Sequence, residues 1–266
     1  MAVVTHPRLI HGSGTAEGAW QAWLQTGGIN SCTLEDWLPS AARLVVVAPH
    51  PDDEVLACGG LIAMHRNQGG TLCVIAVTDG EASHRGCPLW EPQTLAQRRR
   101  CESLAGLHQL GVHDAAVTRL AIPDGRVAHH TLRLALRLQW LLRPTDLVLT
   151  TWRHDGHPDH DATGVAASLA CSVVGCRLVE APVWMWHWAS PGDPFVPWHR
   201  LHSVPLKPPA RDRKQAALAA HASQLDPTGR AGGAVLGAAI VARANRACEY
   251  FFVEPAHPHA AHPPIF

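Results

Sequence analysis

The sequence predicts an α/β fold with a mostly parallel sheet, and two features of the chain favour it. Residues 44–48 and 147–151 are hydrophobic runs, as expected for strands buried on both faces of a parallel sheet. Helix-like stretches alternate with such runs, which is typical of parallel strands joined by crossover helices. We therefore expect a Rossmann-like three-layer sandwich, in which helices cover both faces of one sheet.

Local signals bound each expected element. Gly69-Gly70 and Gly111 end two helices, and Arg143-Pro144 stops a third, because proline cannot continue a helix. Residues 189–200 are rich in proline and are expected to form a loop. The expected strands are 44–48, 71–77, 116–122, 146–151, 178–184 and 249–253. The expected helices are 55–68, 94–110, 131–142, 161–174 and one within 207–221.

The chain is expected to form one main domain with an appendage at each end. Residues 1–40 are predicted to be an irregular N-terminal extension packed on the domain, with tryptophans such as Trp20 and Trp37 as packing anchors. Residues 41–254 are predicted to be the domain itself. Residues 255–266 are predicted to be a flexible tail, because they are rich in proline and histidine. The histidines of this tail, His257, His259 and His262, are expected to lie apart from any active site.

Composition argues against several classes of protein. Apolar residues make up 47% of the 266 residues, enough for a sizeable core, and the zero formal net charge gives no reason to expect a nucleic-acid partner. No stretch approaches the roughly 18 apolar residues of a membrane span. The first residues lack the pattern of a signal peptide. The eight cysteines form no C-x-x-C pair, so we expect reduced thiols in a cytoplasmic protein.

Two short motifs follow two of the predicted strands. Residues 49–54 read Pro-His-Pro-Asp-Asp-Glu, and residues 157–160 read His-Pro-Asp-His. Because ligands collect outside the carboxyl ends of the strands in an open α/β sheet, the two motifs can converge on one ion. Two histidines and a carboxylate form a common catalytic zinc set, with water in the open position. Without a cysteine in either motif, the nitrogen and oxygen donors also suit Fe²⁺ or Mn²⁺.

Each motif also has a simpler interpretation. The first could be a solvated turn with an aspartate that caps the next helix. The second could be a hydrated polar loop, although a proline at the first helical position would let both of its histidines reach one region. The occurrence of both motifs after buried strands favours a metal site.

The two motifs resemble the signatures of the LmbE-like (PIG-L) family of zinc-dependent N-acetylglucosaminyl deacetylases. The resemblance covers residues 43–185 and extends to 214–224. It implies that His50, Asp53 and His160 bind the metal and that Asp52 is the general base. It further implies that His157, as an imidazolium, stabilises the tetrahedral intermediate. Asp159 would then support the histidine pair, and Glu54 would help to close the turn.

Four further residues are candidates for substrate binding. Arg99 and Asp124 match the arginine and the acidic residue that the family places near the sugar; a helix-face ion pair and a turn aspartate are the alternatives. Trp184 and Trp186 lie in a tryptophan-rich segment whose faces could stack on a sugar ring or an acyl chain. A hydrophobic plug or an interface in a homo-oligomer is the alternative for these aromatic residues.

The sequence thus predicts a zinc-dependent hydrolase that removes an N-acetyl group from a small-molecule amino sugar or a conjugate containing N-acetylglucosamine. One alternative is an amidase of the same fold that acts on a thiol-sugar conjugate or on a longer N-acyl group. The alternative from another class is a catalytically inactive relative that binds a metal or a ligand. Every catalytic position that the resemblance implies is filled, which disfavours the inactive relative. Hydrolysis that disappears in an Asp52→Ala protein still holding its metal would separate an enzyme from such a relative.

Overall fold

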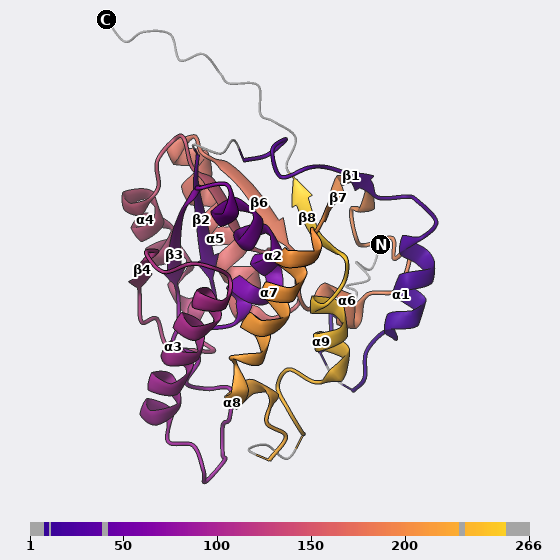
Figure 1. Ribbon diagram of the computed structural model, residues 1–266. Helices are drawn as coiled ribbons and strands as arrows, with labels where there is room; N and C mark the ends of the chain where they lie inside the picture. Colours follow the sequence, from indigo (N-terminus) through magenta and orange to yellow (C-terminus); the bar gives the residue numbers. More distant parts are fainter. Residues whose placement is uncertain (1–7, 11, 39–41, 229–231, 254–266) are drawn as a thin grey trace, which may run out of the picture.

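The computed structural model describes residues 8–10, 12–38, 42–228 and 232–253 (Figure 1). Within them, one eight-stranded sheet has the order β1-β7-β8-β6-β5-β2-β3-β4. The strands are β1 Asn30–Ser31, β2 Arg43–Ala48, β3 Thr71–Ala76, β4 Ala116–Arg119, β5 Leu147–Thr151, β6 Arg177–Ala181, β7 Leu201–Pro205 and β8 Cys248–Val253. Among these, β8 alone runs antiparallel to its neighbours, β6 and β7. The predicted α/β fold with a mostly parallel sheet is confirmed.

Helices cover both faces of this sheet (Figure 1). On one face, α2, α7 and the end of α3 pack on inward side chains such as Leu44 and Val46. On the other face, α4 and α5 pack on the alternate residues Val45 and Val47. Successive side chains of a strand point to opposite faces, so an all-apolar strand supplies both cores. The helices are α1 Glu17–Leu24, α2 Asp53–Asn67, α3 Pro92–Gln109, α4 Thr131–Leu141, α5 Pro158–Val174, α6 Met185–Trp188, α7 Pro208–Ala219, α8 Ala222–Leu225 and α9 Ala238–Ala244, with short 3₁₀ turns η1 Val127–His130 and η2 Trp198–Arg200.

The N-terminal segment is more regular than the sequence predicts. The segment expected to be irregular contains helix α1 and the short strand β1, which pairs with β7. Its Trp20 is fully buried, donates from Nε1 to the Trp186 carbonyl at 2.8 Å, and contacts the Trp186 ring edge-on. A tertiary partner that is distant in the sequence therefore stabilises a helix of eight residues, which would be marginal alone. The domain boundary near residue 41 stays a prediction.

Other boundaries differ in detail. Strand β6 ends at Ala181, before the expected end at 184, because the backbone of 183–185 turns to donate hydrogen bonds to Asp155. Strand β4 is likewise three residues shorter than expected. The predicted tail, 255–266, lies outside the described residues. Among the described residues, no helix is both long and apolar enough to cross a membrane.

Candidate metal centre and active site

The loops that follow β2, β4 and β5 meet at the carboxyl edge of the sheet. Strand β2 lies between β3 and β5, so the chain leaves it towards one side of the sheet and later returns on the other. This reversal of strand order forms the crevice in which open α/β sheets bind ligands. The two motifs flank it from β2 and β5, and Asp124 approaches from the loop after β4.

Asp53, the first residue of α2, lies between the two candidate histidine ligands. Its Oδ2 atom lies 3.2 Å from His50 Nδ1 and 3.2 Å from His160 Nε2. The same oxygen accepts the backbone N–H of His50 at 3.0 Å, which closes the turn. Burial would raise the pKa of Asp53, but the neighbouring His160 and His50 outweigh it and lower that pKa. Residues that are about a hundred positions apart thus share one buried contact, as the motif spacing predicts.

Asp155 orients His160, and the sequence prediction missed it. His160 Nδ1 lies 2.8 Å from Asp155 Oδ2, and the Asp155 carboxylate also accepts the backbone N–H groups of residues 183, 184 and 185 at 2.8–2.9 Å. In the neutral imidazole, an N–H donated from Nδ1 to this carboxylate leaves the lone pair of Nε2 available to bind a metal. The available signal was an acidic residue two positions before His157, in a loop that supplies a histidine needing an orienting partner.

The neutral His157 ring carries its hydrogen on Nε2, so this nitrogen can donate a hydrogen bond. It caps helix α5, and its Nδ1 accepts the backbone N–H of Asp159 at 3.2 Å. Nδ1 is therefore unprotonated, and Nε2 carries the hydrogen of the neutral ring. Burial, with the charges of His160 and His50, lowers the pKa of His157 to about 3. In this structure the residue is a neutral imidazole that can donate from Nε2, whereas the resemblance implies an imidazolium.

The carboxylate of Asp159 contacts His50 rather than the rings of His157 and His160. Its Oδ2 lies 3.2 Å from His50 Nε2, and its two oxygens accept the backbone N–H groups of Gly125 and Val127 at 2.7 and 3.1 Å. Asp124 Oδ1 lies 3.2 Å from the same Nε2. Burial would lower the pKa of His50, but hydrogen bonds to Asp124, Asp159 and Asp53 outweigh it and raise that pKa well above the usual 6.5.

Asp52 is held by Arg99 and by its own turn. Arg99 Nη2 donates to Asp52 Oδ2 at 3.0 Å, and both side chains are buried. The Asp52 backbone N–H donates to Glu54, whose other oxygen accepts the Ser103 hydroxyl. Burial raises the pKa of Asp52 to about 6 against the opposing Arg99 charge. A carboxylate with this pKa is ionised at neutral pH and can accept a proton.

The donors of this cluster suit a cation. Ring nitrogens of His50, His157 and His160 lie within 4.8 Å of one another, and so do donor atoms of His50, Asp124 and Asp159. His157 is the weakest ligand candidate, because one ring nitrogen accepts a hydrogen bond and the other carries the proton. The region also buries more carboxylates than cations, and a divalent ion would balance them. The carboxylates are Asp52, Asp53, Asp124, Asp155 and Asp159, beside Arg99 and the three histidines.

A family model described as PIG-L, GlcNAc-PI de-N-acetylase, matches residues 45–171, the span that contains both motifs and every ligand candidate. The chain contains a PIG-L (LmbE-like) domain. Within this PIG-L domain, β2 supplies the first motif and α5 begins with the second. The recognition made from the two motifs is therefore confirmed.

Curated relatives resemble the PIG-L domain and part of its surroundings. One, from Bacillus subtilis (strain 168), is named probable N-acetyl-alpha-D-glucosaminyl L-malate deacetylase 2; it is 29% identical over 130 residues, which cover 47% of this chain and 58% of the relative. Another, from Rhodococcus erythropolis, is named 1D-myo-inositol 2-acetamido-2-deoxy-alpha-D-glucopyranoside deacetylase; it is 34% identical over 33% of this chain and 31% of the relative. The chain thus matches less than two thirds of the length of these relatives.

Solved structures share the fold over a longer span. A deacetylase triple mutant from the teicoplanin biosynthetic pathway has a TM-score of 0.62 and 22% identity, over 80% of this chain and 97% of that one. The conserved protein TT1542 from Thermus thermophilus has a TM-score of 0.56 and 26% identity, over 84% and 99%. GalB, a 4-carboxy-2-hydroxymuconate hydratase, has a TM-score of 0.54 and 18% identity, over 84% and 100%. A hydratase among these structures means that the fold alone does not specify the reaction.

The predicted substrate residues Arg99, Trp184 and Trp186 are buried to different extents. Arg99 lies behind Asp52 with its guanidinium bound to Asp52 and to the carbonyls of Gly80 and Pro51. Trp184 is half-buried and stacks on His157 at 6.5 Å between ring centroids. Trp186 is 4% exposed within an aromatic cluster. Trp184 therefore occupies the better place for a substrate wall, whereas Trp186 packs; both roles in binding stay predictions.

Proposed function

We propose that the protein is a metal-dependent hydrolase that removes the N-acetyl group of an amino sugar or of a conjugate containing N-acetylglucosamine. The observation that carries the proposal is Asp52, a buried and ionisable carboxylate beside a cluster of nitrogen and oxygen donors. His50, Asp53 and His160 would hold the ion, with zinc as the first candidate and Fe²⁺ or Mn²⁺ as alternatives. The names of the two relatives, both deacetylases of glucosaminyl compounds, support the choice of substrate.

When bound, the metal ion would polarise the acyl carbonyl and acidify a water molecule. Asp52 accepts the proton of the attacking water, and the Arg99 guanidinium fixes the orientation of this carboxylate. His157 donates from Nε2 to the oxygen on which negative charge develops, because its Nδ1 is occupied by the backbone of Asp159. Asp52 then returns the proton to the leaving amine, with His157 as the alternative donor. The products are acetate and the free amino sugar.

Asp155 and Asp159 act on the histidines in this mechanism. Asp155 keeps His160 Nε2 directed at Asp53, and Asp159 holds the far nitrogen of His50. Such partners fix the tautomer and the ring orientation of ligand histidines. Asp159, assigned to catalysis from the resemblance, therefore has the position of an orienting residue for His50.

The alternative reaction within the same fold is hydrolysis of a thiol-sugar conjugate or of a longer N-acyl group. The half-buried Trp184 beside His157 favours an acyl or sugar surface without distinguishing the two. A panel of N-acetyl and longer N-acyl glucosamine compounds separates them, because a site for longer acyl groups would favour those substrates in kcat/KM.

The test of the function combines metal content with turnover. The wild-type protein is expected to hold about one metal ion per chain and to release acetate. The Asp52→Asn protein is expected to keep the ion while its rate falls roughly 10²–10⁴-fold, the usual contribution of a general base. Asp114→Asn, at an exposed aspartate, is the matched control. An Asp52→Asn protein with the wild-type rate would refute the mechanism, and no metal after reconstitution would refute the site.

A further inference from the structure

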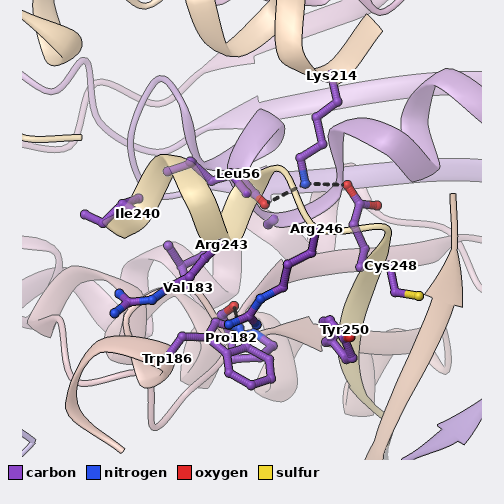
Figure 2. Close-up of a pocket in the computed structure, with 13 residues that line it drawn as sticks. Leu56, Pro182, Val183, Trp186, Lys214, Ile240, Arg243, Arg246, Cys248 and Tyr250 are labelled. Carbon is purple, nitrogen blue, oxygen red and sulfur yellow. Dashed lines mark hydrogen bonds and ion pairs between the residues drawn. The ribbon is translucent and has the colours of Figure 1, made fainter. Parts of the chain in front are cut away.

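A pocket lined by charged and apolar side chains lies between α2, α9 and β8 (Figure 2). Its cavity has a volume of about 40 Å³. At roughly 10–15 Å³ for a water molecule by this measure, the cavity has room for about three non-hydrogen atoms. Apolar walls come from Leu56, Val183 and Ile240, and three cationic side chains, Lys214, Arg243 and Arg246, also line it.

Two of the three cations have carboxylate partners. Lys214 Nζ lies 2.7 Å from Glu249 and also donates to the Leu56 carbonyl, as the dashed lines in Figure 2 show. Arg246 donates from Nε and Nη2 to the two oxygens of Glu17 at 2.8 and 2.7 Å. Its guanidinium also lies 4.2 Å from the centre of the Trp186 ring. These charges are balanced within the protein.

Arg243 is the exception. It is 7% exposed, and its Nη2 donates to the Thr15 carbonyl at 2.8 Å. Its Nε and Nη1 are buried and have no hydrogen-bond partner among the described residues. Glu17, the carboxylate whose charge acts on Arg243, is already bound by Arg246. A buried guanidinium with two unsatisfied donors is costly unless an acceptor is supplied.

We propose that this pocket binds a carboxylate group, which pairs with Arg243. A carboxylate group has three non-hydrogen atoms, and acetate has four, which is close to the room in the cavity. Its two oxygens can bind side by side to a planar guanidinium. The single unbalanced positive charge calls for a single negative charge. Phosphate is larger and carries more charge, so it fits less well. The carboxylate can belong to a free acid such as acetate, or it can be carried by a substrate.

The pocket shares neighbouring residues with the cluster of candidate metal ligands, although none of those ligands lines it. Val183 lines the pocket, and its backbone N–H donates to Asp155 Oδ1, while Asp155 Oδ2 contacts His160. Leu56 lines it from the first turn of α2, which begins at Asp53. A bound carboxylate would therefore lie one layer of residues behind the candidate ligands. This position suits a subsite for an acidic group on a substrate or for the acid that the reaction releases.

The test measures binding directly on the full, metal-loaded chain. The melting temperature is recorded against sodium acetate, with sodium chloride holding the ionic strength constant. Wild-type protein is expected to show a saturable rise, and Arg243→Met to bind acetate about tenfold more weakly or worse, since hydrogen bonds to charged groups are among the stronger ones. Acetate bound at the metal contributes equally to both proteins, so the difference isolates the pocket. Arg133→Met, at an exposed arginine on α4, is the matched control.

The outcomes separate the sources of the carboxylate. If Arg243 governs the binding of free acetate, the ligand is a free acid. If it governs only a glucosaminide with a carboxylate on its aglycone, compared with the neutral glycoside, the carboxylate belongs to a substrate; this arm alone rests on the proposed function. Equal responses of wild type and Arg243→Met to every carboxylate would overturn the proposal, as would tighter binding of inorganic phosphate. Arg243→Lys, which keeps the charge, serves if the Met variant fails to fold. Because binding needs no turnover, this failure is distinct from failure of the proposed hydrolysis.

Discussion

The buried ion pair of Lys214 and Glu249 is expected to hold the helix that carries the first motif. Helix α2 leaves helical geometry at Cys58, where φ is −151° and ψ is 23°. In an unbroken helix the Leu56 carbonyl would accept the N–H of Gly60. Here the Leu56 carbonyl accepts from Lys214, and Glu249 accepts the N–H groups of Gly60 at 2.7 Å and Leu61 at 2.9 Å. The ion pair therefore satisfies both sides of the kink.

The substitution Glu249→Gln tests this arrangement. It leaves a buried ammonium without its counter-charge and replaces one of two acceptor oxygens by a donor, next to an N–H that needs an acceptor. Breaking a buried pair from one side costs about 3–5 kcal/mol. For a chain of this size, 1 kcal/mol corresponds to about 2–4 °C, so a loss of 3 kcal/mol lowers the melting temperature by about 6–12 °C.

The assay is thermal or urea-induced unfolding of wild type, Glu249→Gln, Lys214→Met and the double variant. Asp114→Asn is the control. The ion pair of Asp114 with Arg66 is exposed on the aspartate side and should contribute less than about 1 kcal/mol to the free energy of unfolding. We expect the double variant to be more stable than the sum of the single losses implies, because it leaves no unpaired charge. A Glu249→Gln protein within 1 kcal/mol of wild type, on the scale of the control, would refute the reasoning.

Three further predictions concern the histidines. Asp155→Asn should weaken zinc binding about 10–100-fold, measured by competition with a chromophoric chelator, because His160 loses its orienting carboxylate; unchanged affinity would contradict that role. Zinc binding at neutral pH should release about one proton from each of His50 and His160, whose pKa values are raised in the metal-free protein, to about 9 for His160; calorimetry in buffers of different ionisation enthalpy counts them, and zero protons would be inconsistent with these ligands. Burial lowers the pKa of His221 from 6.5 to about 4, so protonation of this histidine favours the unfolded chain. The contribution of neutral His221 to the free energy of unfolding is therefore complete above pH 6.5 and falls by up to about 3 kcal/mol towards pH 4. Unfolding of the His221→Gln protein, measured across this pH range, should lack this dependence.

Strong patterns predicted the central part of the fold. The run Leu44 to Ala48 has no polar residue, as expected for a strand covered on both sides, and it forms the interior strand β2. Helix α1 and strand β7 were not predicted, because neither has a pattern of its own. Trp20 becomes buried against Trp186 and Trp198, and β7 exists by pairing with β8. Such elements depend on partners far away in the sequence, which a local pattern does not contain.

The site was predictable in its residue types and only partly in its contacts. Two histidine-aspartate motifs after neighbouring strands led to the cluster of His50, Asp53 and His160. The partner of Asp159 was not predictable, because Gly125 and Val127 turn its carboxylate towards His50. The three arginines 98–100 were equally ambiguous. Their sequence does not reveal that Arg99 alone points inward, with its side chain 3% exposed, while the side chains of its two neighbours are 52% and 43% exposed.

Residues after the matched family span, 45–171, hold the candidate metal ligands in place. Residues 183–185 hold Asp155 through three backbone N–H groups, and Asp155 holds His160. From the other side, Glu249 and Lys214 hold the kink of α2, the helix that begins with Asp53. Two of the candidate ligands, His160 and Asp53, are thus fixed by segments that belong to no signature motif. Because the tryptophan-rich segment and the Arg243 pocket lie in those segments, changes that alter substrate choice would also act on ligand geometry. Substitutions there should therefore shift metal affinity and kcat/KM together, whereas a purely peripheral substrate wall would shift kcat/KM alone.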